Sequence, residues 1–307
     1  MITVTIDAGH YAKYNHSPVT KGYYESERMW VLSRKLGKAL ESLGCRVVYT
    51  RKDQAKDLEV YKRGKLSKGT DLFISLHSDG ASDENISRVS VFAAFDNKNN
   101  AKVLAKMLAD TVADTMQIKK RAVKTRINSK GDNEYYGVMR GARNVGCPLY
   151  YIIEHGFHTN RHDSLWLMGD DNLDMLAKAE ARAVMLYFSA QNAFDGLLYG
   201  FCAGTRIGDA INTLKAFGYD ASTQKAYETA VATGDAFYIG DKLYTAVVMG
   251  DANGDGKINM LDYTLARRVR LKMLKPDKYV ISALDFDGDG EVNDSDTDTL
   301  KRLIQRF

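Results

Sequence analysis

Four residues with chemically useful side chains stand at the ends of predicted secondary-structure elements: His10, Glu25, His77 and Glu154. Each histidine follows an apolar run that predicts a strand, and Glu25 lies where a helical pattern begins. Open α/β folds build their sites at the edge where their strands end. Two imidazoles and one carboxylate, with a fourth position open, form the ligand set of a catalytic zinc. The pattern therefore predicts one catalytic zinc held by His10, Glu25 and His77.

Glu154 ends a further apolar run, residues 149–154, and is expected at the same edge. A carboxylate beside a metal-bound water can take its proton and pass it to a leaving nitrogen. We therefore predict that Glu154 is the acid and base of a hydrolase. Any one of the four residues alone is more often structural, so the prediction depends on their occurring together. His16, His158 and His162 lie in polar stretches and are expected at the surface.

The end of the chain carries one loop pattern twice, beginning at Asp251 and at Asp285. Each copy matches the EF-hand calcium loop, with oxygen donors at positions 1, 3, 5 and 12, glycine at 6 and a backbone carbonyl at 7. Two structural Ca²⁺ ions are therefore predicted. A helix is expected after each loop, the first reaching about Met273 and the second Phe307, and no obvious helical pattern precedes either loop. The predicted ligands are Asp251, Asn253, Asp255, Lys257 and Asp262 in the first loop, and Asp285, Asp287, Asp289, Glu291 and Asp296 in the second.

The elements that must position the first four residues alternate between strand and helix, which predicts an α/β fold. One helix is expected from about Glu25 to Leu43, closed by Gly44, because its apolar residues recur with helical spacing. Further helices are expected over residues 100–116 and 173–188. The predicted strands lie around Ile2, Val4 and Ile6, and over residues 45–50, 71–77, 89–95, 136–139 and 149–154.

Three domains follow from these patterns. Residues 1–192 form the α/β domain, and residues 249–307 form an all-α module of paired EF-hand-like loops. Between them, residues 193–248 are a linker and a small α+β module. This module has short helices over 205–217 and 222–231, and paired strands over 237–239 and 243–248. Its sequence indicates no function.

Composition excludes several classes of protein. The net charge of +4 on 307 residues is small and scattered, which suits an anionic surface such as a cell wall but does not indicate nucleic-acid binding. No apolar run approaches the roughly 20 residues that span a bilayer. No signal peptide precedes the first strand, so synthesis in the cytoplasm is expected, unless a leader was removed. The widely spaced Cys45, Cys147 and Cys202 are expected to be free, buried thiols.

The sequences DAGH, YYESE, SLHSD and YYIIEHGF, in this order and spacing, resemble the family 3 N-acetylmuramoyl-L-alanine amidases over residues 1–190. The resemblance implies a mixed, twisted α/β sheet flanked by helices. It also implies that zinc is bound at the positions of His10, Glu25 and His77, and that Glu154 is the catalytic acid and base. The implied reaction is hydrolysis of the amide between the lactyl group of N-acetylmuramic acid and L-alanine in peptidoglycan.

Three positions qualify this resemblance. Met29 stands where the family usually has asparagine, which leaves Glu27 as an alternative zinc ligand to Glu25. His155 stands where the family usually has threonine or serine, so it either contacts substrate or fills a loop. Arg140, in the sequence Val-Met-Arg-Gly, matches a recurring family position and is predicted to contact substrate.

The duplicated calcium loops resemble a type I dockerin, the module that binds cohesins, over residues 249–307. Loop positions 10 and 11, at which dockerins contact their partner, are Met260-Leu261 in one copy and Asp294-Ser295 in the other. This difference argues against a standard cohesin as the partner and against a symmetric dual binding mode. The expected partners of the module are a cohesin or a cell-wall polymer.

The two resemblances favour different biological settings. An amidase without a leader resembles a phage or prophage endolysin of a Gram-positive, clostridial-type host, made in the cytoplasm and released to act on the cell wall. A secreted dockerin-bearing autolysin, tethered to a cohesin scaffold, is the alternative. A non-catalytic, calcium-dependent wall-binding protein is a third. In each case peptidoglycan is the expected ligand, with no nucleic-acid partner and no membrane span.

Overall fold

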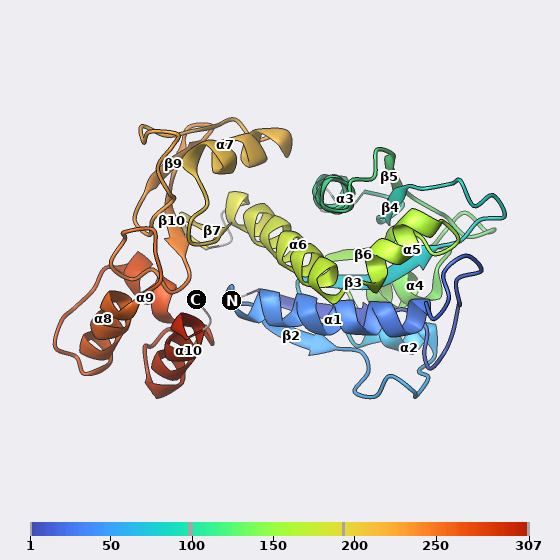
Figure 1. Cartoon of the computed structure of the whole chain (residues 1–307), viewed down its shortest axis with the longest axis horizontal. Helices are drawn as coiled ribbons and strands as arrows, with labels where there is room; N and C mark the ends of the chain where they lie inside the picture. Colours follow the sequence, from blue (N-terminus) through green and yellow to red (C-terminus); the bar gives the residue numbers. More distant parts are fainter. Residues whose placement is uncertain (1, 98–100, 192–193, 306–307) are drawn as a thin grey trace. The chain divides into compact units, whose positions relative to one another are not determined.

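The computed structural model describes residues 2–97, 101–191 and 194–305, shown in Figure 1. The chain divides into two compact units. The first contains Ile2–Leu40 and Val47–Ala183, and the second contains Glu41–Arg46 and the described residues from Val184 onward. The predicted boundary between residues 192 and 193 lies outside the described residues.

A six-stranded sheet with the strand order β2-β1-β3-β6-β4-β5 forms the centre of the first unit. β1, β3 and β6 are parallel, whereas β4 runs antiparallel to β6 and parallel to β5. The predicted mixed sheet is therefore confirmed. The apolar runs of β3 and β6 are buried, as expected of strands covered on both faces. The strands are β1 (Thr3–Ala8), β2 (Arg46–Tyr49), β3 (Leu72–Asp79), β4 (Val89–Phe92), β5 (Arg121–Lys124) and β6 (Leu149–Phe157).

Helices flank the sheet on both faces (Figure 1). The Tyr151 hydroxyl on β6 donates to the Ala101 carbonyl of α3 at 2.8 Å, whereas the neighbouring Tyr150 hydroxyl accepts from Arg143 of α4 at 3.3 Å. Because side chains alternate along a strand, Glu154 shares the α4 face with Tyr150. The helices are α1 (Glu25–Glu41), α2 (Val60–Lys65), α3 (Ala101–Met116), α4 (Gly137–Asn144), α5 (Arg161–Met168) and α6 (Asp170–Ala190).

The strand predicted over residues 136–139 is wrong, because helix α4 begins at Gly137. Val138 and Ala142, one turn apart, are both buried. α4 packs so closely on α2 that a Cβ on Gly141 would lie 2.2 Å from the Tyr61 carbonyl oxygen. This glycine-mediated contact between two short helices cannot be recognised in a four-residue window of sequence.

Other predicted bounds in the first unit differ by smaller amounts. The strand predicted to reach residue 95 ends at Phe92, and the helix predicted from Leu173 begins at Asp170. Asn100, the predicted start of the next helix, lies outside the described residues, and α3 is described from Ala101. The short elements α2, β5 and α5 were not predicted, because each offers too few periodic positions.

The second unit begins with a four-stranded sheet of order β7-β10-β9-β8 and one helix, α7 (Ile207–Ala216). The predicted pair of strands around Gly240 is confirmed, since β9 and β10 are antiparallel neighbours. The helix predicted over 222–231 is wrong. There, the carbonyls of Tyr227 and Thr229 accept from the first amides of α7, so the segment is held as turns. The strands are β7 (Leu197–Phe201), β8 (Ala221–Ser222), β9 (Ala236–Ile239) and β10 (Lys242–Val248).

Three helices complete the second unit: α8 (Met260–Arg270), α9 (Lys278–Leu284) and α10 (Asp294–Ile304). α8 and α10 follow the two loops as predicted, although Phe307 lies outside the described residues. α9 precedes the second loop, where no helix was predicted. Among the described helices, none is both long enough and apolar enough to cross a membrane.

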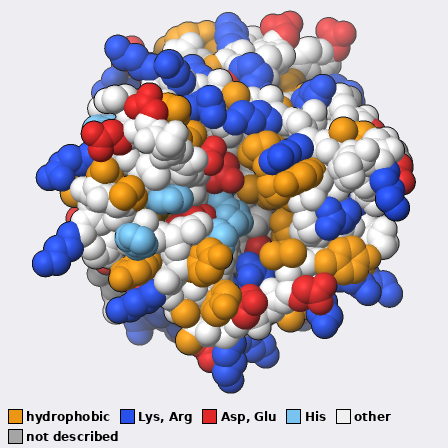
Figure 2. Space-filling model, turned by 90° about the vertical axis from the view of Figure 1, so that its right-hand side faces the viewer, with side chains coloured by type: hydrophobic (Ala, Val, Ile, Leu, Met, Phe, Trp, Pro, Cys, Tyr) orange, Lys and Arg blue, Asp and Glu red, His pale blue; other side chains and the backbone are white. Residues whose placement is uncertain are grey.

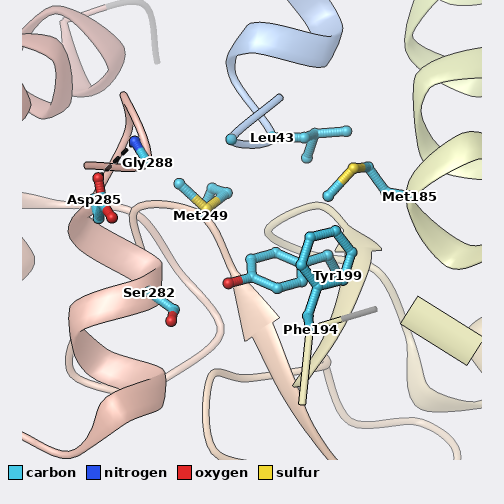
Figure 3. Close-up of a pocket in the computed structure, with 9 residues that line it drawn as sticks. Leu43, Met185, Phe194, Tyr199, Met249, Ser282, Asp285 and Gly288 are labelled. Atoms are coloured by element: carbon cyan, nitrogen blue, oxygen red, sulfur yellow. Dashed lines mark hydrogen bonds between the residues drawn. The ribbon is translucent and has the colours of Figure 1, made fainter. Parts of the chain in front are cut away.

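A small pocket within the second unit is drawn in Figure 3. Its lining is largely aromatic and sulfur-containing, from Phe194, Tyr199, Met185 and Met249. Asp285 is its only acidic lining residue, and that carboxylate accepts from the Gly288 amide at 2.6 Å. None of its lining residues is a predicted zinc ligand.

Candidate metal centre and active site

The end of β1 approaches β3 very closely, and this contact places the first histidine. The Gly9 amide donates to the Leu76 carbonyl at 2.9 Å, and a Cβ on Gly9 would lie 2.5 Å from a ring carbon of His77. Only glycine fits this approach. The next residue, His10, has a φ of +55°, and the Arg51 guanidinium donates to its carbonyl. The turn thus directs the His10 ring toward the end of β3.

His10, Glu25 and His77 converge, as predicted. Their ligand atoms all lie within 4.8 Å of one another. His77 Nδ1 is 2.9 Å from one Glu25 oxygen, and His10 Nε2 is 3.5 Å from the other. The Asn15 amide donates to Glu25 at 2.7 Å, and the Ser78 amide donates to it at 3.1 Å. Figure 2 shows histidine and acidic side chains gathered at a hollow in this face of the molecule.

The electrostatics of this cluster fit a cation among the three side chains. Burial opposes ionisation of Glu25, but the hydrogen bond and charge of His77 lower the pKa of Glu25 to about 2. Burial likewise opposes protonation of His77, but Glu25 raises the pKa of His77 to about 9. Burial lowers the pKa of His10 to about 4. A divalent metal would replace the proton between His77 and Glu25, and two imidazoles with one carboxylate suit zinc.

The structure brings Glu25, and not the alternative Glu27, to the two histidines. We expect Glu25→Ala to remove the bound zinc, while Glu27→Ala, two residues further along α1, retains one zinc per chain. The loss of affinity should exceed the ~10–100-fold that loss of an outer hydrogen-bond partner costs. Metal analysis after dialysis, with chelator competition, measures both variants. Zinc retention in Glu25→Ala together with zinc loss in Glu27→Ala would reverse the assignment.

Glu154 lies directly beside the cluster, since it is the register partner of His77 across the β3–β6 ladder. Its Oε2 atom is buried and makes no hydrogen bond within the described chain. Burial raises the pKa of Glu154 to about 7; His77 opposes this rise and Glu25 adds to it. A buried carboxyl with this pKa can both take and release a proton at neutral pH.

In each calcium loop, the first and the last predicted acidic residues are turned inward. The Asp251 carboxylate accepts from the amides of Asp255 and Gly256, and Asp262 accepts from those of Ala252 and Asn253. The second loop repeats this geometry at its own first and last acidic residues. In addition, Asn259 and Asn293 cap the helices that follow, each in a capping box with the loop's last aspartate. Position 12 therefore holds both the loop and the helix start.

The second loop brings its first three acidic side chains together. Oxygens of Asp285, Asp287 and Asp289 lie within 4.8 Å of one another. Burial raises the pKa of Asp285 and of Asp296; the charge of Asp296 adds to the rise at Asp285, and the charge of Asp287 adds to the rise at Asp296. Crowded carboxylates of this kind are the oxygen donors that Ca²⁺ binds.

A sequence model of the N-acetylmuramoyl-L-alanine amidase family matches residues 4–185, more than half of the chain. The chain belongs to this family. A model of the dockerin type I domain matches residues 249–305 of the same amidase. No curated protein sequence matches it in a direct comparison.

Solved structures share the fold of the first unit. The catalytic domain of CwlV, an N-acetylmuramoyl-L-alanine amidase from Bacillus (Paenibacillus) polymyxa var. colistinus, is 21% identical with a TM-score of 0.53, over 62% of this amidase and 99% of that chain. Cwp6 from Clostridium difficile is 23% identical with a TM-score of 0.54, over 60% of this amidase and only 28% of that chain. The CwlD amidase from Clostridioides difficile is 20% identical with a TM-score of 0.51, over 62% and 99% of the two chains.

His155 of the amidase occupies neither of the places predicted for it, because it is fully buried and away from solvent. The β3–β6 ladder shifts register just beyond His77, and Gly156 there has a φ of +72°. At this irregularity His155 Nδ1 donates to the His77 carbonyl at 2.9 Å, while Nε2 lies 3.0 Å from Glu180 of α6. His155 therefore links the metal-binding end of β3 to α6.

The prediction that His158 lies at the surface is wrong. Its side chain is only 12% exposed, and its Nδ1 donates to the Ser78 carbonyl at 2.9 Å and lies 3.9 Å from Glu25. In the sequence, only the position of His158 shortly after Glu154 indicated that it lies near the candidate site. His16 and His162 are exposed, as predicted. The described cysteines form no disulfide with one another; Cys45 and Cys147 are buried, as predicted, but Cys202 is only half-buried.

Arg140 of the amidase lies on α4 and not among the residues of the metal cluster. Its guanidinium donates to the carbonyls of Glu134 and Tyr135. These bonds fix the segment that leads into α4. A direct contact of Arg140 with substrate stays a prediction.

Proposed function

We propose that this protein hydrolyses the amide between N-acetylmuramic acid and L-alanine in peptidoglycan, with one zinc held by His10, Glu25 and His77. The observation that carries the proposal is the convergence of these three side chains beside Glu154, a buried carboxyl with an unpaired oxygen. Zinc bound there would polarise the substrate carbonyl and lower the pKa of its water.

The residues of the chain then have separate tasks. Glu154, with a pKa near 7, takes the proton as the water oxygen bonds to the carbonyl carbon. The same carboxyl returns the proton to the alanine nitrogen as the carbon–nitrogen bond breaks. Glu25 stays ionised throughout, and hydrogen bonds from the Asn15 side-chain amide and the Ser78 backbone amide keep its carboxylate in place.

Mass spectrometry of purified peptidoglycan tests this proposal. After incubation with the zinc- and calcium-loaded protein, we expect stem peptides with a free L-alanine amine and intact glycan chains. Cleavage only within the glycan or within the peptide would assign a different hydrolase. Zinc binding and wall binding without any cleavage would favour the third interpretation, a non-catalytic wall-binding protein.

We further propose that the dockerin module binds a cohesin-type partner through its first repeat. Met260 and Leu261 are 58% and 64% exposed at the start of α8. At the equivalent place in the second repeat, Asp294 is paired with Arg270 of α8. The two repeats therefore present different surfaces, which supports one binding mode. A cell-wall polymer is the alternative ligand, and failure to bind any cohesin in a panel would favour it.

Calcium occupancy of the module is directly measurable. We expect two Ca²⁺ ions per chain in the wild type and one in Asp285→Ala, because that substitution removes the carboxylate that accepts three loop amides. Each ion, at about 100 times its Kd, should stabilise this module by ~2.7 kcal/mol, so the wild type should gain about twice as much as Asp285→Ala. Calorimetric titration and thermal unfolding in chelator measure both effects. The exposed Asp298→Ala on α10 is the control, and equal calcium stoichiometry in the two variants would contradict the assignment.

The biological setting follows from neither domain alone. A phage or prophage endolysin of a Gram-positive host, made in the cytoplasm and released at lysis, stays our prediction. The dockerin match supports the alternative, a secreted autolysin on a cohesin scaffold. Binding of the intact chain to a cohesin with high affinity would select the autolysin.

A further inference from the structure

Three basic side chains near the active site have no acidic partner. Within the described residues, no carboxylate oxygen lies within 4.0 Å of the charged nitrogens of Arg88, Lys124 or Arg126, although neighbouring cations are paired: Arg121 with Asp110 and Asp114, and Arg143 with Asp96. Arg88 and Lys124 are half-buried, so solvent screens their positive charges only in part.

Strand register places this cationic group on the same face of the sheet as Glu154. Ser90 of β4 is the partner of Glu154, and Phe92, two residues on, is the partner of Lys124 on β5. Directly opposed residues point to one face, as do residues two apart. Arg88 reaches this group too, since its Nε donates to the Ser90 hydroxyl at 3.2 Å. The cations therefore continue from the catalytic carboxyl toward the β5 edge.

Aromatic rings hold two of the cations without neutralising them. Lys124 Nζ lies 5.3 Å from the centre of the Phe92 ring, and the Arg126 guanidinium lies 3.5 Å from that of Tyr135. Tyr136 packs edge-on against Phe92 at 4.9 Å and thereby joins the two pairs. Both distances are typical of cation–π contacts. The result is a positioned set of positive charges with no carboxylate at ion-pair distance in the described part of the chain.

Burial and the nearby Arg88 lower the pKa of Lys124, and their effect exceeds the opposing effect of the Asp79 and Glu154 charges. An incoming carboxylate would relieve that repulsion. A neutral sugar would contact the rings but would leave the cations unpaired. The charges therefore favour an acidic peptide over a glycan as the ligand of this surface.

We propose that Arg88, Lys124 and Arg126 form a subsite for a carboxylate of the stem peptide, with Phe92, Tyr135 and Tyr136 as its aromatic support. The inference rests on the proposed amidase function. It implies that substrate runs from the metal centre across β4 toward β5, so that the peptide side of the scissile amide lies over Lys124. It also makes the charge of the second stem residue a determinant of specificity.

Two synthetic substrates test this subsite: a muramyl peptide whose second residue is D-glutamate with a free α-carboxylate, and the same peptide with that group as a carboxamide. We expect Lys124→Met to lower kcat/KM by about tenfold to a hundredfold on the carboxylate substrate, the range for hydrogen bonds to charged groups, and to change the carboxamide substrate little. Lys124→Arg should retain most of the preference. Lys119→Met, which removes an exposed lysine just before β5, is the matched control.

The possible outcomes distinguish failure of the carboxylate subsite from failure of the proposed amidase activity. Equal losses of kcat/KM on both substrates in folded Lys124→Met would overturn the carboxylate subsite. A loss confined to Tyr135→Ala, on both substrates and greater with longer glycans, would instead assign the surface to sugar stacking. Absence of cleavage of either substrate by the wild type would reject the amidase proposal itself, and the subsite with it. Circular dichroism and thermal unfolding of each variant identify losses caused by misfolding.

Discussion

Glu154→Gln is expected to lower kcat on a muramyl peptide by about 10²–10⁴-fold, the usual contribution of a positioned general acid–base group. Glutamine has nearly the same shape as glutamate but cannot take a proton from water. Glu154 is not one of the three residues proposed to bind zinc, so the variant should keep one zinc per chain. The substitution also removes an ionisable group from a buried position, which should leave the fold intact or slightly more stable.

Single-turnover kinetics and metal analysis on the same preparations measure this effect. The control is Glu84→Gln, which makes the same chemical change at an exposed position before β4. Loss of zinc together with activity would make Glu154 a metal ligand instead of a proton carrier. Turnover within a few-fold of wild type would remove it from the mechanism altogether.

The convergence of the metal site could be predicted because its signals are local. His10, His77 and Glu154 each follow an apolar run long enough to define a central strand, and such runs in α/β folds end at a shared edge. The second motif added Glu25 at the start of a helix with clear periodicity. These four positions needed no knowledge of the exact register between strands.

The roles of His155 and His158 depended on that register and could not be predicted. The ladder shift beyond His77 leaves carbonyls at the end of β3 that the two imidazoles bond. A polar stretch after a strand carries no signal for such long-range contacts. The cationic group near the active site could not be predicted for the same reason. Arg88 and Lys124 are brought together only by the pairing of β4 with β5.

The calcium module shows the same division between local and long-range information. Repetition of the loop pattern in phase predicted its ligands and the helices that follow, since each loop's last aspartate also caps the helix start. The helix before the second loop was not predicted because its seven residues offer too few periodic positions. The different surfaces of the two repeats could be predicted from Met260-Leu261 and Asp294-Ser295.

Glu180→Ala is expected to destabilise the first unit by about 3–5 kcal/mol, the cost of removing one partner from a buried ion pair. His155 and Glu180 are both fully buried, and no solvent can replace the lost carboxylate. Because His155 also holds the His77 carbonyl, loss of the pair should loosen the end of β3 and weaken zinc binding. Asp171→Ala, which removes an exposed carboxylate from the same helix, is the control.

The pH dependence of this effect distinguishes an ion pair from simple packing. Burial alone would lower the pKa of His155, but the charge and hydrogen bond of Glu180 raise it above its ordinary value. The folded chain therefore holds this proton more tightly than the unfolded chain. The resulting stabilisation is fully present below about pH 6.5, the unfolded pKa of histidine, and is lost as pH rises through the raised folded pKa. Urea unfolding of the wild type and Glu180→Ala across this range should show a difference that shrinks as pH rises, whereas a constant difference would mean that Glu180 only fills space.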